Sequence, residues 1–389
     1  MRNRNHRTLP WVAALLLAAF SFAGAAIITD STPVPPAGDL GGPTVPLFGA
    51  DLDQWIRGRK VFDRDWSLPQ GLGSPDMNSD SCRSCHQTPI IGGAGLLDVN
   101  VFRFGRDEGG TGPFTDLPGG QIGSKNRRPD TPGREDAHLD SDVFEVRQTP
   151  IMFGIGLIES IPASAITANE DPFDTDLDGC RGVARFIDVG AGVLEIGRFG
   201  WKSQVPTVRD FVGDGLANEI GITVAADGRP FVLPADADAV ADPEALAGDI
   251  DDLTFFLENF APPPRAGGTD PAIAVGEALF SSVGCATCHI PSLAGSGGPV
   301  PLFSDLLLHD IHPADFRGMG EPGGAGVGMY RTPPLWGVRM SAPYLHDGSA
   351  PTILEAILRH EDEATGVRTA FEALPAADQE ALLAFLQDL

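Results

Sequence analysis

The chain is poor in basic residues, in cysteine and in long apolar runs. It has 27 lysines and arginines against 53 aspartates and glutamates, which gives a formal net charge of −26 at pH 7. This excess of acid argues against binding to nucleic acid or to anionic lipid, because both carry negative charge themselves. It is typical of a soluble protein that attracts a small basic partner, although the same charge also serves solubility alone.

The apolar run near the start, residues 11–22, is too short to span a bilayer comfortably. Three arginines precede it, and Ala23-Gly24-Ala25 supplies the small residues that a signal peptidase requires. We therefore predict a signal peptide over residues 1–25 and a periplasmic protein that meets the membrane only through this segment. A membrane anchor is the competing interpretation.

Only five cysteines are present, and four of them form two C-x-x-C pairs, each followed by a histidine. The motifs are Cys82-Arg-Ser-Cys85-His86 and Cys285-Ala-Thr-Cys288-His289. In a C-x-x-C-H motif the two thiols form thioethers with haem, and the histidine supplies the proximal iron ligand. A zinc half-site or a redox disulfide also uses C-x-x-C, but two such motifs in one exported chain favour two covalently bound haems c. Cys180 is predicted to be a free, buried thiol.

An internal repeat surrounds the two motifs. Gly58 and Phe62 precede the first motif as Gly276 and Phe280 precede the second. Each half also closes with apolar residues at the i, i+3, i+4, i+7 spacing of a helix, at 253–260 and at 382–389. We expect the glycine to let the closing helix cross the opening helix at close range.

The repeat predicts a mainly α fold made of two copies of one helical module in tandem. The prolines of Ala261-Pro-Pro-Pro-Arg265 end the first closing helix. We therefore divide the mature chain into a linker at 26–48, a first domain at 49–264 and a second at 265–389. The first domain is enlarged by insertions rich in Gly, Pro and Asp, which predict long loops; such loops are often functional.

The ligand at the sixth position of each haem iron decides whether that haem transfers electrons or reacts with a substrate. An iron with two strong ligands transfers electrons, whereas an open iron can bind peroxide. Residues 351–360 are predicted to form a helix with Ser349 as its cap. Ile353, Ile357 and His360 would share one face of this helix, which makes His360 a candidate distal ligand. A core histidine that is satisfied by its neighbours is the alternative.

Three segments near the end of the chain carry a family resemblance, supported by residues 149–162 and 197–204. They are Arg331-Thr-Pro-Pro-Leu-Trp-Gly-Val-Arg339, Pro343-Tyr-Leu-His-Asp-Gly-Ser349 and Leu354-Glu-Ala-Ile-Leu-Arg-His360. The sequence resembles the bacterial di-haem cytochrome c peroxidase and MauG superfamily, and within it the family called di-haem oxidoreductase, putative peroxidase. The resemblance implies two cytochrome c-like domains. The haem of the second stores an electron, and the haem of the first reacts with peroxide.

The resemblance also assigns roles to single residues. His360 matches the distal ligand of the second haem, which is Met in the peroxidases and Tyr in MauG. Two histidine ligands should give that haem a lower potential than His and Met. The backbone carbonyls of Ser341 and Pro343 match positions that hold a calcium ion between the haems, and His346 matches a histidine of the same loop.

The first haem has no evident distal ligand. No histidine follows His86 until His138, so this haem is open or is capped by His138, by Met152 or by a loop residue. A peroxidase also needs an acid/base near the open iron. Glu159 lies in the neighbourhood where the superfamily keeps its distal glutamate, although an ordinary acid at a helix end is the alternative.

A candidate calcium loop lies in the enlarged first half. Asp174, Asp176 and Asp178 form the D-x-D-x-D-G beginning of such a loop, in which alternate carboxylates bind one cation. Arg185 stands at the twelfth position, where an EF-hand has a bidentate glutamate. An aspartate-rich turn without an ion is the alternative.

Together these patterns predict a periplasmic di-haem oxidoreductase of the peroxidase type. It would take electrons from a small basic cytochrome c or cupredoxin through the second haem and reduce hydrogen peroxide at the first. Trp201 and Trp336 are candidates to relay electrons between the haems, or else are core residues. A non-enzymatic electron carrier and a MauG-like enzyme that modifies another protein are the alternatives.

Overall fold

The computed structural model describes residues 28–73, 78–110, 114–115, 117, 123–124, 137–321 and 324–389. The predicted signal peptide, residues 1–25, lies outside the described residues. Among the residues that are described, no helix combines the length and the apolar character needed to cross a bilayer. Helices make up most of the regular structure in these ranges, in agreement with the predicted mainly α fold.

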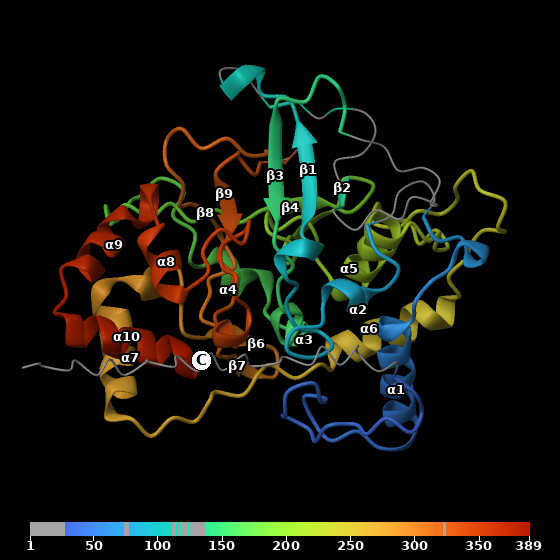
Figure 1. The fold of residues 1–389 in the computed structure, drawn as a ribbon, viewed down its shortest axis with the longest axis horizontal. Coiled ribbons are helices and arrows are strands. Elements are labelled where there is room, and N and C mark those ends of the chain that lie inside the picture. Colours follow the sequence, from blue (N-terminus) through green and yellow to red (C-terminus); the bar gives the residue numbers. More distant parts are fainter. Residues whose placement is uncertain are drawn as a thin grey trace, which may run out of the picture.

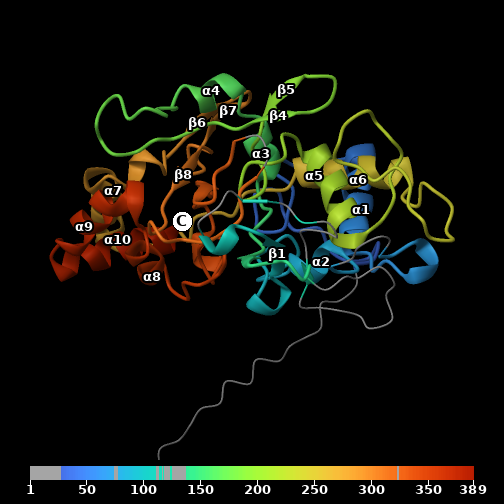
Figure 2. The ribbon, with the colours of Figure 1, turned by 90° about the horizontal axis from the view of Figure 1, so that it is seen from above.

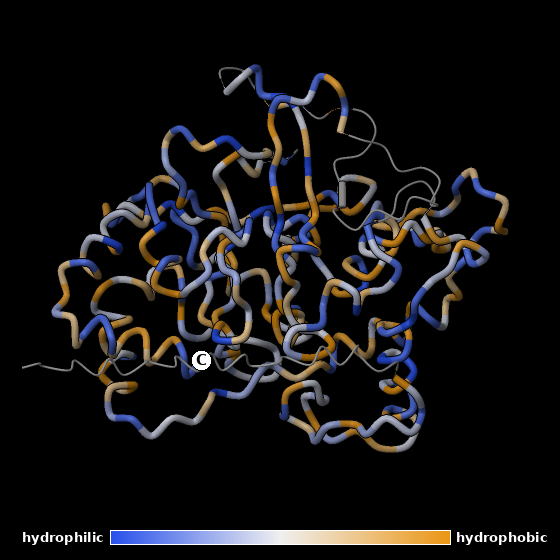
Figure 3. The backbone as a smooth tube through the Cα atoms, viewed as in Figure 1, coloured by the Kyte–Doolittle hydropathy of each residue, from blue (hydrophilic) through white to orange (hydrophobic). Residues whose placement is uncertain are grey.

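Two helix pairs lie on opposite sides of the molecule. In the first pair α1 (Gly49–Asp63) packs against α6 (Ala247–Glu258), and in the second α7 (Pro271–Val283) packs against α10 (Ala376–Asp388). Figures 1 and 2 show the two pairs well separated, with the strands between them. Figure 3 shows hydrophobic residues recurring along these helices.

The other helices are short and connect these pairs to the middle of the molecule. The α-helices are α2 (Cys82–Cys85), α3 (Ile155–Glu159), α4 (Ala163–Thr167), α5 (Val208–Gly215), α8 (Ile353–Leu358) and α9 (Thr365–Glu372). A π-helical turn, η4 (Leu216–Ile220), continues α5. The 3₁₀ turns are η1 (Leu68–Gln70), η2 (Leu97–Val99), η3 (Glu108–Gly110), η5 (Cys285–Thr287), η6 (Val338–Met340) and η7 (Asp362–Ala364).

The strands form small antiparallel sheets. The largest has the order β2-β1-β3 and consists of β1 (Val101–Gly105), β2 (Gly123–Ser124) and β3 (Val143–Arg147). The two-stranded sheets are β4 (Phe186–Asp188) with β5 (Leu194–Ile196), β6 (Leu293–Gly295) with β7 (Gly298–Val300), and β8 (Leu308–Asp310) with β9 (Met329–Arg331). The sequence predicts only loops in the enlarged first half, yet β1 to β5 form there. Paired strands supply hydrogen-bond partners for backbone N–H and C=O groups that would otherwise be buried without a partner.

Glycine sets the distance between the helices of each pair. A Cβ atom added at Gly58 would come closer than 3.0 Å to the backbone of Asp252 in α6. One added at Gly276 would come equally close to the backbone of Ala381 in α10. Real Cβ atoms are essentially never that close to another atom, so only glycine permits these crossings. The predicted role of both glycines is confirmed.

Equivalent aromatic residues fill the contact between the helices of each pair. The ring centroids of Phe62 and Phe256 are 5.7 Å apart in the first pair. Those of Phe280 and Phe385 are 5.4 Å apart in the second. All four rings are buried, and they occupy matching positions of the sequence repeat. The repeat in the sequence is therefore also a repeat in packing.

The predicted linker packs against the first helix pair instead of hanging free. The amide N–H of Ala261 donates to the carbonyl of Gly42, and the N–H of Thr44 donates to the carbonyl of Asn259 at 2.7 Å. Arg59 of α1 donates to the carbonyl of Pro33. The carbonyl of Asn259 lies at the end of α6 and has no partner inside the helix, and the carbonyls of Gly42 and Pro33 are the linker's own acceptors.

A buried histidine joins three segments of the second half. His309 of β8 has Nε2 2.8 Å from a carboxylate oxygen of Asp305 and Nδ1 3.0 Å from one of Glu363. Burial by itself lowers the pKa of His309, but the hydrogen bonds and charges of the two carboxylates outweigh it and raise that pKa to about 10. The imidazole is therefore charged at neutral pH and forms buried ion pairs.

Replacing Gly276 by alanine should destabilise the protein by about 1–3 kcal/mol, because the added Cβ meets rigid backbone. Gly248→Ala in α6 is the matched control, since a Cβ at Gly248 has no atom within 4 Å. That control should be stabilised by about 0.5–1 kcal/mol. Denaturant unfolding measures the free energy of unfolding of both variants, and equal values would contradict the close crossing of α7 and α10.

Replacing His309 by alanine should cost about 3–5 kcal/mol near pH 6, because it leaves the buried Asp305 without an ionic partner and leaves Glu363 with Arg181 alone. The folded pKa of about 10 lies above the value of about 6.5 for an unfolded histidine. The contribution of the charge is therefore complete below about pH 6.5 and is lost as the pH rises towards 10. Thermal unfolding of both proteins across this range should show the difference shrink. A constant difference, or an equal effect of His138→Ala at the surface, would contradict the buried charge.

Candidate functional site

One internal cavity reaches both C-x-x-C-H motifs. Its walls come from both helix pairs and include Phe62 of α1, Leu253 of α6, Phe280 of α7 and Leu382 of α10. The predicted haem-binding residues that line it are Cys82, Cys85, His86, Cys285, Cys288, His289 and His360. The fold thus brings together residues that are far apart in the sequence.

Backbone carbonyls orient His86 at the end of α2. Its Nδ1 lies 3.0 Å from the carbonyl oxygen of Pro150 and 3.3 Å from that of Gly93. Carbonyl oxygens only accept hydrogen bonds, so Nδ1 is assigned the proton and Nε2 keeps a free lone pair. Burial lowers the pKa of His86 to about 4, so the ring is neutral at pH 7, as a metal ligand must be.

His289 has equivalent surroundings. Its Nδ1 lies 3.0 Å from the carbonyl oxygen of Phe303, and burial lowers its pKa to about 4. Phe280 packs beside His289 with ring centroids 6.4 Å apart, as Phe62 packs beside His86 at 6.3 Å. Both motifs therefore present a neutral, oriented imidazole to the cavity.

His360 lies just past the end of α8. The structure begins this helix at Ile353 with Thr352 as its cap, in a capping box with Glu355, and not at the predicted cap Ser349. Thr352 is the cap because its side chain accepts from the backbone N–H of Glu355, the third helical residue, which has no partner inside the helix. The helix ends at Leu358, so the predicted helix over 351–360 is too long at both ends.

The imidazole of His360 is fixed in the same way as the other two. Its Nδ1 lies 2.7 Å from the carbonyl oxygen of Ala356, and burial lowers its pKa. His360 is also close enough to His289 to lower the pKa of that ring, after the larger effect of burial. Two neutral imidazoles therefore share the end of the cavity beside the second motif.

The residues of the cavity fit two covalently attached haems. None of the five cysteines forms a disulfide, and burial raises the pKa of Cys82 and Cys85 to about 12 and that of Cys285 to about 11. Each motif thus presents two uncharged thiols beside one neutral imidazole, which is the donor set that c-type attachment requires. Cys288 also approaches Asp305 and His309, but His309 already uses both nitrogens on carboxylates.

Glu159, the predicted acid/base, does not line the cavity. It ends α3, and its carboxylate accepts the backbone N–H of Val208 in the first turn of α5 at 2.9 Å. The carboxylate thereby satisfies one of the unpaired donors at a helix N-terminus, a role that does not fit the predicted acid/base. Asp214 and Glu219 line the cavity instead. Neither belongs to a recognisable motif, so no sequence signal pointed to them.

Met152 and His138 are the two named candidates for the distal ligand of the first haem, and they lie in different places. Met152 lines the cavity, but it follows closely on Pro150, whose carbonyl holds His86. His138 does not line the cavity; it is partly exposed, and its Nδ1 accepts from the backbone N–H of Asp140 at 3.2 Å. His138 therefore does not reach the cavity in this structure.

The two predicted calcium positions also differ. Ser341 and Pro343 line the cavity, in the loop that carries His346. In the aspartate-rich loop the carboxylates of Asp171, Asp174 and Asp176 converge to within 4.8 Å of one another. Asp178 instead accepts the backbone N–H of the buried Cys180 at 2.8 Å. Two of the three predicted aspartates, Asp174 and Asp176, therefore lie in this group together with Asp171, and calcium binding here stays a prediction.

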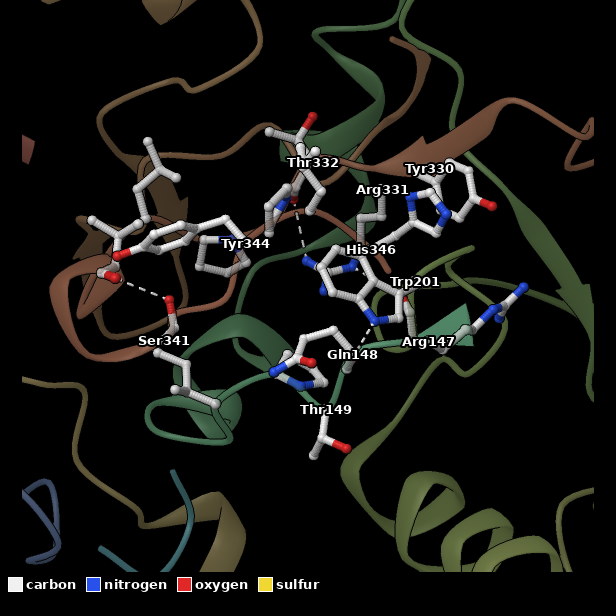
Figure 4. A pocket seen from close by; sticks show the side chains of 18 of the residues that line it. Arg147, Gln148, Thr149, Trp201, Tyr330, Arg331, Thr332, Ser341, Tyr344 and His346 are labelled. Atoms are coloured by element: carbon white, nitrogen blue, oxygen red, sulfur yellow. Dashed lines mark hydrogen bonds between the residues drawn. The ribbon is translucent and has the colours of Figure 1, made fainter. Parts of the chain in front are cut away.

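Aromatic side chains also line the cavity. The indole N–H of Trp201 donates to the carbonyl of Gln148 at 2.7 Å, the bond drawn as a dashed line in Figure 4. His346 stacks on Tyr330 with ring centroids 4.0 Å apart and lies 6.5 Å from the Trp201 ring. The ammonium of the buried Lys202 lies 3.9 Å from the centre of the Tyr330 ring. Trp336 is also buried and lines the cavity.

A family match covers more than half of the chain. The family described as di-haem oxidoreductase, putative peroxidase, matches residues 135–389. This range contains the second C-x-x-C-H motif, His360 and the aromatic residues between the motifs, whereas the first motif precedes it. No curated protein matches the chain.

Several solved structures are similar over most of their length. A MauG-like protein associated with microbial copper homeostasis is 17% identical with a TM-score of 0.43, covering 93% of this chain and 94% of that one. The diheme peroxidase BthA from Burkholderia thailandensis E264 is 17% identical with a TM-score of 0.43, covering 92% and 90%. Kuenenia stuttgartiensis hydrazine synthase is 15% identical with a TM-score of 0.40, covering 93% and 98%. Sequence identities and TM-scores this low do not establish a common activity.

The family match and the cavity agree on the kind of protein. The family description names two haem groups, and the cavity holds two C-x-x-C-H motifs, each with an oriented, neutral imidazole. The match over residues 135–389 shows that this chain belongs to the family of di-haem oxidoreductases.

Proposed function

We propose that the protein is a periplasmic di-haem c-type peroxidase. It takes electrons from a small basic redox protein at the second motif and reduces hydrogen peroxide at the first. The observation that carries this proposal is the inequality of the two ends of the cavity. His289 faces a second imidazole, His360, which lowers its pKa. No other histidine contributes to the lowered pKa of His86.

The end of the cavity beside the second motif favours one ligation state, in which both histidines stay bound. His289 and His360 would both be ligands of the second haem iron, and both rings are hydrogen-bonded to backbone carbonyls. The capping box of α8 fixes the helix that carries the Ala356 carbonyl. An imidazole held in this way does not leave easily, and two histidine ligands favour electron transfer over binding of a further molecule.

At the first end, His86 would be the one strong ligand of the haem iron. Phe211, Val212 and Leu216 of α5 and η4 are apolar residues that line the cavity, and Asp214 and Glu219 of the same segment line it too. When bound, the two haems supply electron storage and the reductive cleavage of the peroxide bond. The chain would supply the apolar wall, which excludes bulk water, and ionisable groups that can move a proton.

The middle of the cavity would connect the two ends. We assign Trp201, held by the Gln148 carbonyl, as the residue that electrons cross. By the family resemblance, the carbonyls of Ser341 and Pro343 would hold a calcium ion beside it. Residues 49–264 and 265–389 would then be two cytochrome c-like domains, with one haem each and the cavity between them.

The partner and the compartment follow from charge and export. A net charge of −26 supports docking of a small basic cytochrome c or cupredoxin. The signal sequence at residues 1–25 supports delivery to the periplasm, where haem is attached to C-x-x-C-H motifs.

Absorption and electron paramagnetic resonance spectra of the purified protein test the proposal. We expect one low-spin haem and one haem that binds carbon monoxide when reduced and reacts with hydrogen peroxide. A wholly low-spin protein that ignores both molecules would contradict the peroxidase function and favour the electron carrier. Oxidation of a partner protein's side chain, in place of peroxide turnover with a reduced cytochrome, would favour the MauG-like alternative.

Replacing His360 by methionine should alter the spectrum of the second haem alone and raise its reduction potential, since thioether ligation favours the reduced iron. Peroxide binding at the first haem should persist. His138→Met is the matched control, because His138 lies outside the cavity, and its spectra should equal those of the wild type. An unchanged second haem in the His360 variant would contradict the distal-ligand assignment.

A further inference from the structure

The cysteine outside the two C-x-x-C-H motifs lies beside the second of them. Cys180 follows the aspartate-rich loop, and its backbone N–H donates to the carboxylate of Asp178 at 2.8 Å. Its side chain is 8% exposed and lines the same cavity as Cys288. The structure thus confirms the predicted free, buried thiol and places it next to a haem motif.

His309 and Glu363 hold Cys180 and Cys288 in one cluster. The carboxylate of Glu363 accepts the backbone N–H of Arg181, the residue after Cys180, at 2.8 Å. The same carboxylate lies 3.0 Å from Nδ1 of His309, and that nitrogen lies 3.6 Å from the sulfur of Cys288. The sulfur of Cys180 lies 3.9 Å from the backbone carbonyl oxygen of Glu363. Both sulfurs therefore pack against the same two residues.

The two sulfurs are also close to each other. Cys180 and Cys288 lie within hydrogen-bonding reach. The first motif has different neighbours, because Cys85 is hydrogen-bonded to the hydroxyl groups of Ser79 and Ser84. Oxidation can join a thiol to a second thiol, whereas a hydroxyl group offers no such reaction. Of the two motifs, the second therefore has a third thiol beside it.

Haem attachment and disulfide formation compete for the sulfur of Cys288. Attachment turns this thiol into a thioether with haem. A disulfide consumes the same thiol, and an oxidising compartment favours disulfides between neighbouring cysteines. The two reactions therefore exclude each other at Cys288.

The packing favours a bond to Cys180 over a bond within the motif. Both motifs can form a disulfide between their own two cysteines. A disulfide between segments that are far apart in the sequence restricts the unfolded chain more than one within C-x-x-C does, and it stabilises the folded chain accordingly. Thiol exchange should therefore favour the bond between Cys180 and Cys288 once their segments have packed together.

We propose that Cys180 and Cys288 form a disulfide in exported chains that lack the second haem, and that this bond blocks haem attachment at the second motif. Two S–H bonds break and one S–S bond forms. The two protons and two electrons pass to a disulfide oxidant of the periplasm, which becomes two thiols. A dithiol reductant reverses the step and returns Cys288 to the thiol that haem attachment requires.

The proposal rests on the proposed covalent attachment of haem at the second motif, and it does not depend on peroxidase activity. In the protein with both haems Cys288 is bound to haem, and Cys180 stays a free thiol. The disulfide thus belongs to the incomplete protein.

Thiol trapping in the full chain tests the proposal. Exported protein is collected from cells with a limited supply of haem, unfolded in the presence of N-ethylmaleimide, digested and analysed by mass spectrometry. Chains without a second haem should yield two peptides joined through Cys180 and Cys288. Chains with both haems should yield Cys180 labelled by N-ethylmaleimide. A bond between Cys285 and Cys288, or a labelled Cys180 in chains without a second haem, would overturn the proposal.

The variant Cys180→Ser removes the competing thiol and keeps a small polar side chain. With oxidised glutathione in the growth medium, the ratio of haem on the second motif to haem on the first should fall in the wild type. It should stay unchanged in the variant, and dithiothreitol should restore the wild-type ratio. The first motif is the internal control, since oxidation within C-x-x-C affects both motifs. Cys180→Ala should behave like Cys180→Ser, which separates the loss of the thiol from a change in packing.

The possible failures point to different statements. A wild-type ratio that does not respond to the oxidant, or an equal fall in both variants, would overturn the role of Cys180 and leave haem attachment intact. Absence of haem from Cys288 under every condition would overturn the proposed attachment at the second motif, and the blocking disulfide with it.

Discussion

The histidine of each C-x-x-C-H motif is oriented by a carbonyl from a distant segment, Pro150 for His86 and Phe303 for His289. The bond places the proton on Nδ1, and burial keeps the ring neutral, so that Nε2 is free to bind a metal. Both conditions hold only if the helix pairs bring the motif, the carbonyl-bearing loop and the apolar wall together. The close helix crossings at Gly58 and Gly276 are therefore a precondition for the site.

Burial acts on the ionisable groups of this molecule in opposite ways, depending on their partners. Burial alone would raise the pKa of Glu145, but the charges of Arg147 and Lys202 lower it to about 2. For Asp214 and Glu219 burial outweighs the charge of Arg103, so the pKa of each is raised. The same chain thus contains buried acids that are permanently charged and buried acids that can exchange a proton. The first kind holds segments together, and the second kind is available for chemistry.

The two halves are alike in sequence and in helix packing, but they differ in the residues that they contribute to the cavity. Phe62 and Phe280 take equivalent places beside the two proximal histidines. The second half then adds α8 and His360, which close its end of the cavity. The first half adds α5 and η4, which bring carboxyl groups and apolar residues instead. Duplication supplied two similar sites, and the segments between the repeated helices made them different.

Some of this could be predicted from the sequence because it depends on local spacing. The C-x-x-C-H motifs, the paired helices and the glycine at each crossing all follow from patterns within a few residues. His360 was also predicted to reach the site, since one apolar helix face carried it, and it does line the cavity. The end points of α8 were predicted less well, because Thr352 and Glu355 form a capping box whose competition with Ser349 is decided only in the folded loop.

The sequence by itself thus determined the family, the two haem motifs and the mainly α architecture, which local patterns encode. Only the tertiary structure decided which acid faces the cavity. Glu159 caps α5 through the N–H of Val208, while Asp214 and Glu219 turn to the first motif. The physical reason is that a carboxyl group's role depends on which donors and charges surround it, and packing brings these from distant segments. No spacing along the chain contains that information.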